Sequence, residues 1–206
     1  MKKLRLFCAI GALLMASTMN AKVGDTFTEG QFKYKVLSEE GITESGVTTV
    51  TGGTVSATNR VSGYDYSGDY VFPETVTHNG VEYVITTIGS NLFASVYNNP
   101  QSHDNMTSVT IPSTVKRIEG NAFSGNQTSK NSLRNVYLSE GLEFIGEGAF
   151  ANCLIEEIDI PNSVMEIGGA IVYNCPSLKT IKIGKNLKTI GAIKYTSDDS
   201  QSYIYR

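Results

Sequence analysis

The sequence predicts a β-rich solenoid in which short strands coil around one core, with a small β-rich cap at its N-terminal end. The first observation is an apolar repeat in the second half of the chain, which recurs at steps of 27, 22 and 23 along the sequence at Ile111, Leu138, Ile160 and Ile183. A unit of this length cannot bury its own apolar face and must stack on its neighbours. The second observation is that residues 22–70 lack the repeat but contain alternating and β-branched segments. The third is a chain rich in Gly, with no Trp, as is usual in a turn-rich β protein.

Residues 1–21 predict a secretory signal peptide. Lys2, Lys3 and Arg5 precede an apolar run from Leu6 to Ala16, and this run is too short to span a bilayer. We expect cleavage after Ala21, which removes three basic residues and changes the formal net charge from −3 to −6. A negative mature chain argues against nucleic acid or an anionic membrane surface as its partner. No later segment is apolar enough to insert into a membrane.

Residues 22–70 predict the cap. Phe32, Tyr34 and Val36 alternate with polar residues, and the segment 47–51 is rich in Val and Thr, so both indicate strands. A solenoid needs such a cap because its first repeat otherwise exposes core residues and a strand edge.

The repeat region is expected over residues 71–195. Its first copy contains Asn79-Gly80 between two β-branched segments, which predicts a hairpin because both residues accept a positive φ. Two polar insertions, residues 94–105 and 127–132, each precede a new strand and should form one rim of the stack. Residues 196–206 are expected to be a tail or a closing strand, the latter over Ser202–Tyr205.

Cys153 and Cys175 lie one repeat apart, at equivalent places in two successive copies. We expect them to stack in the core as two buried thiols. A disulfide is the alternative, because export leads to an oxidising compartment. Metal binding by two thiols without His partners is disfavoured.

The repeats resemble the BspA-like branch of leucine-rich repeats. The match runs over about residues 71–195, and the segments Leu178–Ile183 and Ile145–Cys153 fit this family's repeat nearly position for position. The resemblance implies a right-handed coil with short helical or 3-10 turns. It also implies an exported protein of Bacteroides-type bacteria, on the cell surface, in the periplasm or secreted. Some relatives act as adhesins toward host matrix proteins, so a protein or glycan partner is expected.

Strand alternation predicts two columns of outward side chains, since every second residue of a half-buried strand faces solvent. One column holds Ser108, Asn135, Glu157 and Thr180, and the other holds Thr110, Tyr137, Asp159 and Lys182. Tyr137 is the one large anchor among them. The candidate binding residues, which include Arg134 just before its strand, are Arg134, Asn135, Tyr137, Glu157, Asp159 and Lys182. The competing interpretation is that these are ordinary solvated positions.

Three further motifs give weaker indications of function. Phe144 and Met165 sit at outward positions of a second face and could form a modest apolar patch, but isolated exposed apolar residues are ordinary, so a binding site there is disfavoured. Gly146–Ala151 fits Gly-x-Gly-x-x-Ala, but so short a repeat unit cannot hold the βαβ frame that dinucleotide binding needs. The acidic segment Asp65–Asp69 lacks the later acidic ligand of a calcium loop.

The sequence therefore predicts no catalytic residue, no cofactor and no metal site. His78 and His103 have no paired ligand spacing, and there is no Gly-x-Ser-x-Gly elbow. The leading interpretation is a non-catalytic exported binding or adhesion module. The alternative is a structural or assembly subunit of a cell-envelope complex. The oligomeric state stays open.

Overall fold

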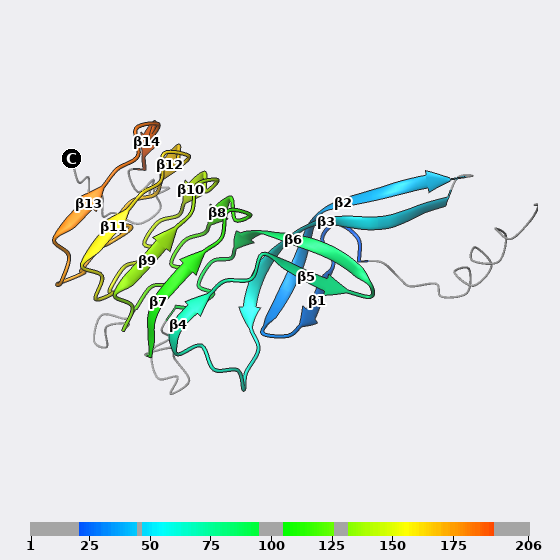
Figure 1. Cartoon of the computed structure of the whole chain (residues 1–206), viewed down its shortest axis with the longest axis horizontal. Helices are drawn as coiled ribbons and strands as arrows, with labels where there is room; N and C mark the ends of the chain where they lie inside the picture. The colour runs from blue at the N-terminus through cyan, green and yellow to red at the C-terminus, as the bar shows by residue number, and fades with distance from the viewer. Residues whose placement is uncertain (1–20, 45–46, 95–104, 126–131, 192–206) are drawn as a thin grey trace, which may run out of the picture.

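The computed structural model describes residues 21–44, 47–94, 105–125 and 132–191. Two sheets run along the molecule, and we call them the long sheet and the short sheet (Figure 1). The long sheet contains β1 (Thr26–Glu29), β2 (Phe32–Glu44), β3 (Val47–Arg60), β5 (Thr75–His78), β6 (Val81–Ile88), β8 (Arg117–Ile118), β10 (Phe144–Ile145), β12 (Glu166–Ile167) and β14 (Thr189–Ile190). The short sheet contains β4 (Gly68–Val71), β7 (Met106–Ile111), β9 (Asn135–Leu138), β11 (Glu157–Asp159) and β13 (Thr180–Lys182).

Each repeat forms one coil, which contributes one strand to each sheet. Within the short sheet all pairings are parallel, and so are the long-sheet pairings from β6 to β14. Because the register aligns equivalent residues of successive coils, their apolar side chains stack in the space between the sheets. The buried rows are Val109, Val136 and Ile158 from the short sheet and Ile88, Ile118, Ile145 and Ile167 from the long sheet. This stacking is what the repeat spacing predicted.

The coil turns differ from the expectation of helical or 3-10 segments, because none occurs in the described residues. In the turn after β8, Phe123 N donates to Ala149 O of the next coil at 2.8 Å, whereas Ala122 N donates back to Glu119 O at 3.3 Å. Successive amides thus alternate between the neighbouring coil and their own turn, so a continuous helical ladder cannot form. The right-handedness of the coil stays a prediction from the family resemblance.

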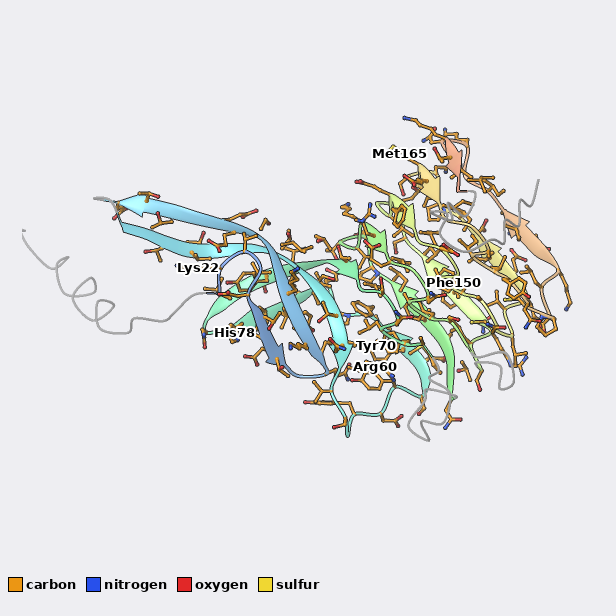
Figure 2. All side chains as sticks on the ribbon, turned by 180° about the vertical axis from the view of Figure 1, so that it is seen from behind. Lys22, Arg60, Tyr70, His78, Phe150 and Met165 are labelled. Carbon is orange, nitrogen blue, oxygen red and sulfur yellow. The ribbon has the colours of Figure 1, made fainter. Side chains whose placement is uncertain are left out.

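The cap is an antiparallel arrangement of β1, β2 and β3, and β3 joins the coils by parallel pairing with β6. An aromatic cluster fills the junction, and Figure 2 shows Arg60 and Tyr70 lying there. The Arg60 guanidinium lies 5.5 Å from the ring centroids of both Tyr66 and Phe93, and its Nε donates to Leu92 O at 2.6 Å. Burial lowers the pKa of Arg60 to about 10. The other rings of this cluster are Phe27, Phe32, Tyr34, Phe72 and Tyr83.

The aromatic stack continues into the coils. The Phe93 and Phe123 rings stack at 5.1 Å between centroids, and those of Phe123 and Phe150 stack at 5.5 Å. All three side chains are fully buried, and Phe150 lies deep within the coils in Figure 2. One ladder of phenylalanine rings therefore links the cap junction to the middle of the stack.

The Asn79-Gly80 hairpin is confirmed. β5 and β6 pair antiparallel, and the two turn residues have φ values of 51° and 79°. These positive values are the ones a two-residue hairpin loop requires. β4 begins at Gly68 and pairs with β7, so the short sheet begins at Gly68.

The two cysteines lie on adjacent coils, as expected. The Cys153 thiol is buried and donates to Phe123 O at 3.3 Å, and the half-buried Cys175 thiol donates to Phe150 O at 3.2 Å. Both contacts repeat one coil apart, which fits the thiol interpretation, but only Cys153 is buried as expected.

Several predictions lie outside the described residues: the signal peptide, His103, most of the two insertions and the closing strand at Ser202–Tyr205. The boundaries of the cap, the repeat region and the tail stay predictions. Among the described residues, no helix has the length and apolarity needed to cross a membrane.

Candidate functional site

The outward face of the short sheet is the candidate site. Its two columns follow the alternation that the sequence predicted, but Ser108 is buried and not exposed as expected, and its hydroxyl donates to Asp69 Oδ1 at 2.6 Å. β4, β7, β9, β11 and β13 lie side by side in Figure 1. The first column is Asp69, Ser108, Asn135, Glu157 and Thr180, and the second is Val71, Thr110, Tyr137, Asp159 and Lys182. Strand spacing of about 4.8 Å makes this face roughly 19 Å wide across its five strands.

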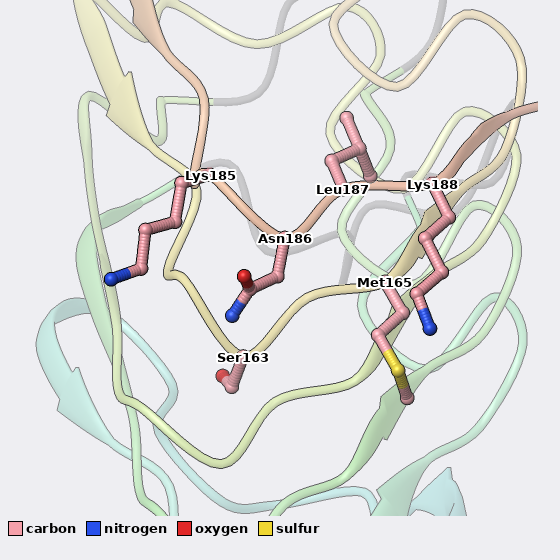
Figure 3. Close-up of a pocket in the computed structure, with 6 residues that line it drawn as sticks. All are labelled: Ser163, Met165, Lys185, Asn186, Leu187 and Lys188. Atoms are coloured by element: carbon pink, nitrogen blue, oxygen red, sulfur yellow. The ribbon is translucent and has the colours of Figure 1, made fainter.

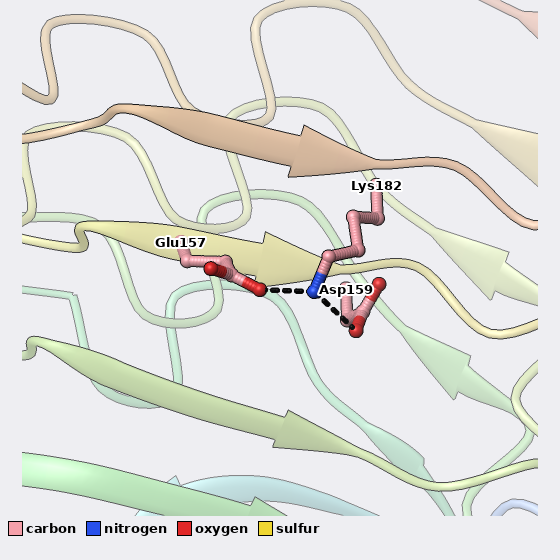
Figure 4. A network of polar contacts seen from close by, with 3 residues as sticks. All are labelled: Glu157, Asp159 and Lys182. Carbon is pink, nitrogen blue, oxygen red and sulfur yellow. Dashed lines mark hydrogen bonds and ion pairs between the residues drawn. The ribbon is translucent and has the colours of Figure 1, made fainter.

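The charged end of the face is a network around Lys182. Its ammonium donates to the Glu157 carboxylate and also contacts Asp159 Oδ2 at 3.3 Å (Figure 4). The hydrogen bonds to Glu157 and Asp159 raise the pKa of Lys182, so this side chain is fully protonated near neutral pH. All three side chains are more than half exposed, so the network orients the charges and adds little to stability.

A second pair lies where the strands begin. Lys179 Nζ contacts Glu156 Oε2 at 2.8 Å, and this hydrogen bond, together with the charge of Lys179, lowers the pKa of the Glu156 carboxyl. The positive charge of Arg134 also lowers the pKa of Glu156, to a smaller extent. Arg134 and Asn135 are both exposed, and the Arg134 amide donates to Thr107 O at 2.9 Å.

The middle strand and the far edge strand of the face each carry one large exposed apolar or aromatic side chain. Tyr137 is 57 % exposed and Val71 is 69 % exposed, on the same column as the charged residues. Tyr137 was predicted from the sequence, whereas Val71 and Asp69 were not, although the strand that carries them matches the start of the repeat. Both could have been found by extending the columns one strand toward the cap.

The face borders an open depression of about 350 Å³ where β11 and β13 end. Glu140 helps to shape it, because its carboxylate accepts hydrogen bonds from the Asn162 and Ser163 amides at 3.1 and 3.0 Å. These bonds lower the pKa of Glu140, with the Asn162 amide as the main cause. The lining residues are Leu138, Glu140, Asp159, Ile160, Pro161, Asn162, Lys182, Ile183 and Gly184.

The second face offers a larger but flatter depression of about 510 Å³ (Figure 3). It is lined by Ser163, Met165, Lys185, Asn186, Leu187 and Lys188. Of the two apolar residues expected on this face, Met165 is 40 % exposed, whereas the Phe144 ring lies under the Arg117 guanidinium at 3.9 Å. Met165 is therefore the exposed member of the pair, while Arg117 covers one face of the Phe144 ring.

The remaining motifs form local structure. Asp65 Oδ1 accepts from the Ser67 amide at 2.8 Å within a polar turn, and hydrogen bonds from Ser67 lower the pKa of Asp65. Gly146–Ala151 is a coil turn in which Gly148 has a φ of 61°. His78 Nδ1 contacts Glu29 Oε1 at 2.7 Å, and its ring stacks on Phe27. No group of three His, Cys, Asp or Glu able to hold a metal occurs in the part of the chain that the structure describes.

The comparisons with known proteins decide the family. A family model for the BspA type leucine-rich repeat region matches residues 86–202 in six copies. The chain belongs to this family. A comparison with curated proteins gives no match.

Solved structures of bacterial leucine-rich repeat proteins share the fold of this BspA-type chain. It is 27 % identical to the pneumococcal vaccine antigen PcpA, with a TM-score of 0.63, over 82 % of this chain and 41 % of that one. It is 29 % identical to a leucine-rich repeat protein from Bacteroides capillosus, with a TM-score of 0.54, over 77 % of this chain and 97 % of that one. The chain thus spans less than half the length of PcpA but nearly all of the Bacteroides protein.

Proposed function

We propose that this chain is an exported, non-catalytic module that binds a protein or a glycan through the outward face of the short sheet. The observation that carries the proposal is the row Tyr137, Asp159 and Lys182, which places an aromatic ring, an acid and a base on adjacent parallel strands. The proposed contact residues around it are Arg134, Asn135 and Glu157.

The outward face of the short sheet is pre-organised for binding. Strand residues of a packed sheet are held by the core beneath them, so they lose little conformational freedom on binding. Tyr137 offers a large exposed ring with a polar tip, which suits a sugar face or an apolar side chain. The Lys182 network offers oriented charge for hydroxyl or amide groups.

The family also supports export and binding. PcpA is described as a vaccine antigen, and another bacterial structure with the same fold is described as a leucine-rich cell surface protein. Leucine-rich repeats are commonly interaction scaffolds, and their specificity lies in the residues that vary between repeats. The three contact residues of the row differ from coil to coil, as a recognition surface requires.

The test replaces Tyr137, Asp159 and Lys182 together by Ala. We expect at least about a tenfold loss of binding to whichever member of a panel of purified matrix proteins and arrayed glycans the unaltered mature protein binds. The matched control replaces Tyr173, Glu166 and Lys188, an aromatic, an acid and a base outside this face, by Ala. Unchanged binding by the folded first variant would refute the site, and loss in the control alone would place the binding site outside the short-sheet face.

The alternative function is an assembly subunit, and one observation favours it. The last coil leaves Ile181, Ile183 and Ile190 about half exposed or more, at 44, 54 and 65 %. Such an apolar end could pair with another chain. Light scattering of the mature protein over a concentration series separates the two functions, since a monomer at every concentration removes this support.

A further inference from the structure

Tyr137 carries an aromatic ring that no other part of the described chain covers. The residue is 57 % exposed, and within the described residues its ring stacks on no other ring or cation and its hydroxyl makes no hydrogen bond. The other outward aromatic residue of the described coil strands, Phe144, is already covered by the Arg117 guanidinium at 3.9 Å. An uncovered ring on a packed strand offers a flat apolar surface to a ligand.

Polar side chains border this ring on both neighbouring strands and on its own. Thr110 lies opposite Tyr137 on β7, and Asp159 lies beside it on β11. Asn135 faces the same way two residues earlier in β9. The Lys182 ammonium contacts Asp159 Oδ2 at 3.3 Å and orients this carboxylate (Figure 4). Because neighbouring strands are about 4.8 Å apart, all of these groups lie within reach of one small ligand on the ring.

We propose that the ligand of this face is a neutral oligosaccharide, one without carboxylate or sulfate groups, with a sugar ring lying on Tyr137. This inference rests on the proposed function and names the ligand class for the same face. A sugar ring has a face of C–H groups that packs on an aromatic ring, and hydroxyls at its border that both donate and accept hydrogen bonds. Thr110, Asn135 and Asp159 supply the matching donors and acceptors.

The charge of the face selects against an acidic sugar. Its two columns contain the acids Asp69, Glu157 and Asp159, and their single base is Lys182. Lys182 is already engaged by Glu157 and Asp159, so it is not free to pair with an anion. A sialylated or sulfated glycan would bring its charge next to carboxylates of the same sign. A neutral sugar avoids this repulsion and can still donate its hydroxyl protons to those carboxylates.

The size of the polar area also favours a short saccharide over a protein. β9 has four residues and β11 and β13 have three each, so this area measures roughly 10 Å across the strands and roughly 13 Å along them. A stable protein partner usually covers about 800 Å², several times more. The depression of about 350 Å³ at the ends of β11 and β13, lined by Asp159, Asn162 and Lys182 among others, leaves room for the next sugar of the chain.

The test probes the mature protein with an array of neutral oligosaccharides of galactose, glucose, mannose and fucose, whose galactose-containing members are also present in sialylated and sulfated form. We expect binding to neutral members. Tyr137→Phe keeps the flat ring and should keep the affinity within about threefold, whereas Tyr137→Leu keeps apolar area without a flat ring and should lose at least about tenfold. The matched control is Tyr173→Leu, a tyrosine that is 55 % exposed outside this face, which should bind normally.

Matrix proteins, intact and after enzymatic removal of their glycans, separate this inference from the proposed function. Binding to the intact forms alone supports a saccharide ligand. Binding to the deglycosylated forms that is lost when Tyr137, Asp159 and Lys182 become Ala would overturn the inference and leave the proposed face in place. A preference for sialylated or sulfated glycans, or equal losses in Tyr137→Phe and Tyr137→Leu, would also overturn it. Absence of binding to every glycan and every protein would overturn both.

Discussion

At the scale of single residues, the turns show where the repeat is strained. One position in successive coils has a positive φ, and it is occupied by Asn91, Asn121, Gly148 and Ala170. Asn and Gly tolerate this left-handed backbone, whereas the Cβ of Ala crowds the following carbonyl at a cost of about 1–2 kcal/mol. Ala170, with a φ of 56°, is therefore the least suitable residue of the four.

The first prediction follows from this strain. Replacing Ala170 by Asn should raise the free energy of unfolding by about 1 kcal/mol, because Asn relieves the strain without the backbone entropy cost of Gly. Urea unfolding of the mature protein measures it. The reverse change in an earlier coil, Asn121→Ala, should lower the stability by a similar amount. Equal stability of Ala170→Asn and the unaltered protein would show that the strain is relieved elsewhere.

At the level of single residues, some features of the site could be predicted from the sequence and others could not. Alternation predicted which side chains of β9, β11 and β13 face outward, since a strand has a period of two. It could not predict that Lys182 joins Glu157 as well as Asp159, because this depends on side-chain rotamers between strands. Nor could it predict that Arg117 covers Phe144, a contact between neighbouring coils.

At the scale of elements, the least supported part of the described chain is the outer part of the β2–β3 hairpin. β2 pairs with β1 only up to Lys35, and β3 pairs with β6 only from Thr54 to Ala57. Beyond these contacts the two strands continue as an isolated ribbon, which projects away from the coils in Figure 1. Its side chains are mostly exposed, with Ile42 at 60 %. A two-stranded ribbon without a core is marginally stable in water.

The second prediction concerns this ribbon. Amides of residues 41–44 and 48–51 should exchange at least about 100-fold faster than those of residues 54–57, although the β2–β3 pairing continues along both parts. Hydrogen exchange by mass spectrometry, with peptides that separate the two regions, measures the difference. Equal protection along the hairpin would indicate that another surface covers the ribbon.

Sequence patterns predicted some strands and turns of the fold but not others. The coil strands and the Asn79-Gly80 hairpin were predicted because burial on one side, or a positive φ, restricts the residues allowed there. The length of the β2–β3 ribbon was not, because Thr-rich and Glu-containing segments in solvent show no burial pattern. The helical turns expected from the family were not confirmed, and none occurs in the described coils, where alternate turn amides bond to the next coil.

At the scale of the whole molecule, burial is graded from one end to the other. The cap junction contains the aromatic cluster, with Phe32, Phe72 and Phe93 fully buried, and the phenylalanine stack reaches Phe150. Past this point the coils have smaller side chains, and the last coil is partly open. In a solenoid each coil contacts only its neighbours, so stability adds along the axis and can differ between ends.

The last prediction is that the molecule opens from its C-terminal end. In native-state hydrogen exchange at rising denaturant, the Gly191 amide, which donates to Ile167 O, should open at a lower free energy than the Gly89 amide, which donates to Ala57 O. Ile158→Ala removes a fully buried side chain and should cost about 2–5 kcal/mol at its own coil. Because coupling acts only between neighbours, this variant should release β13 and β14 while the Gly89 amide keeps its opening free energy. One common opening free energy for both amides, before and after the substitution, would instead mean that the cap and coils unfold as a single cooperative unit.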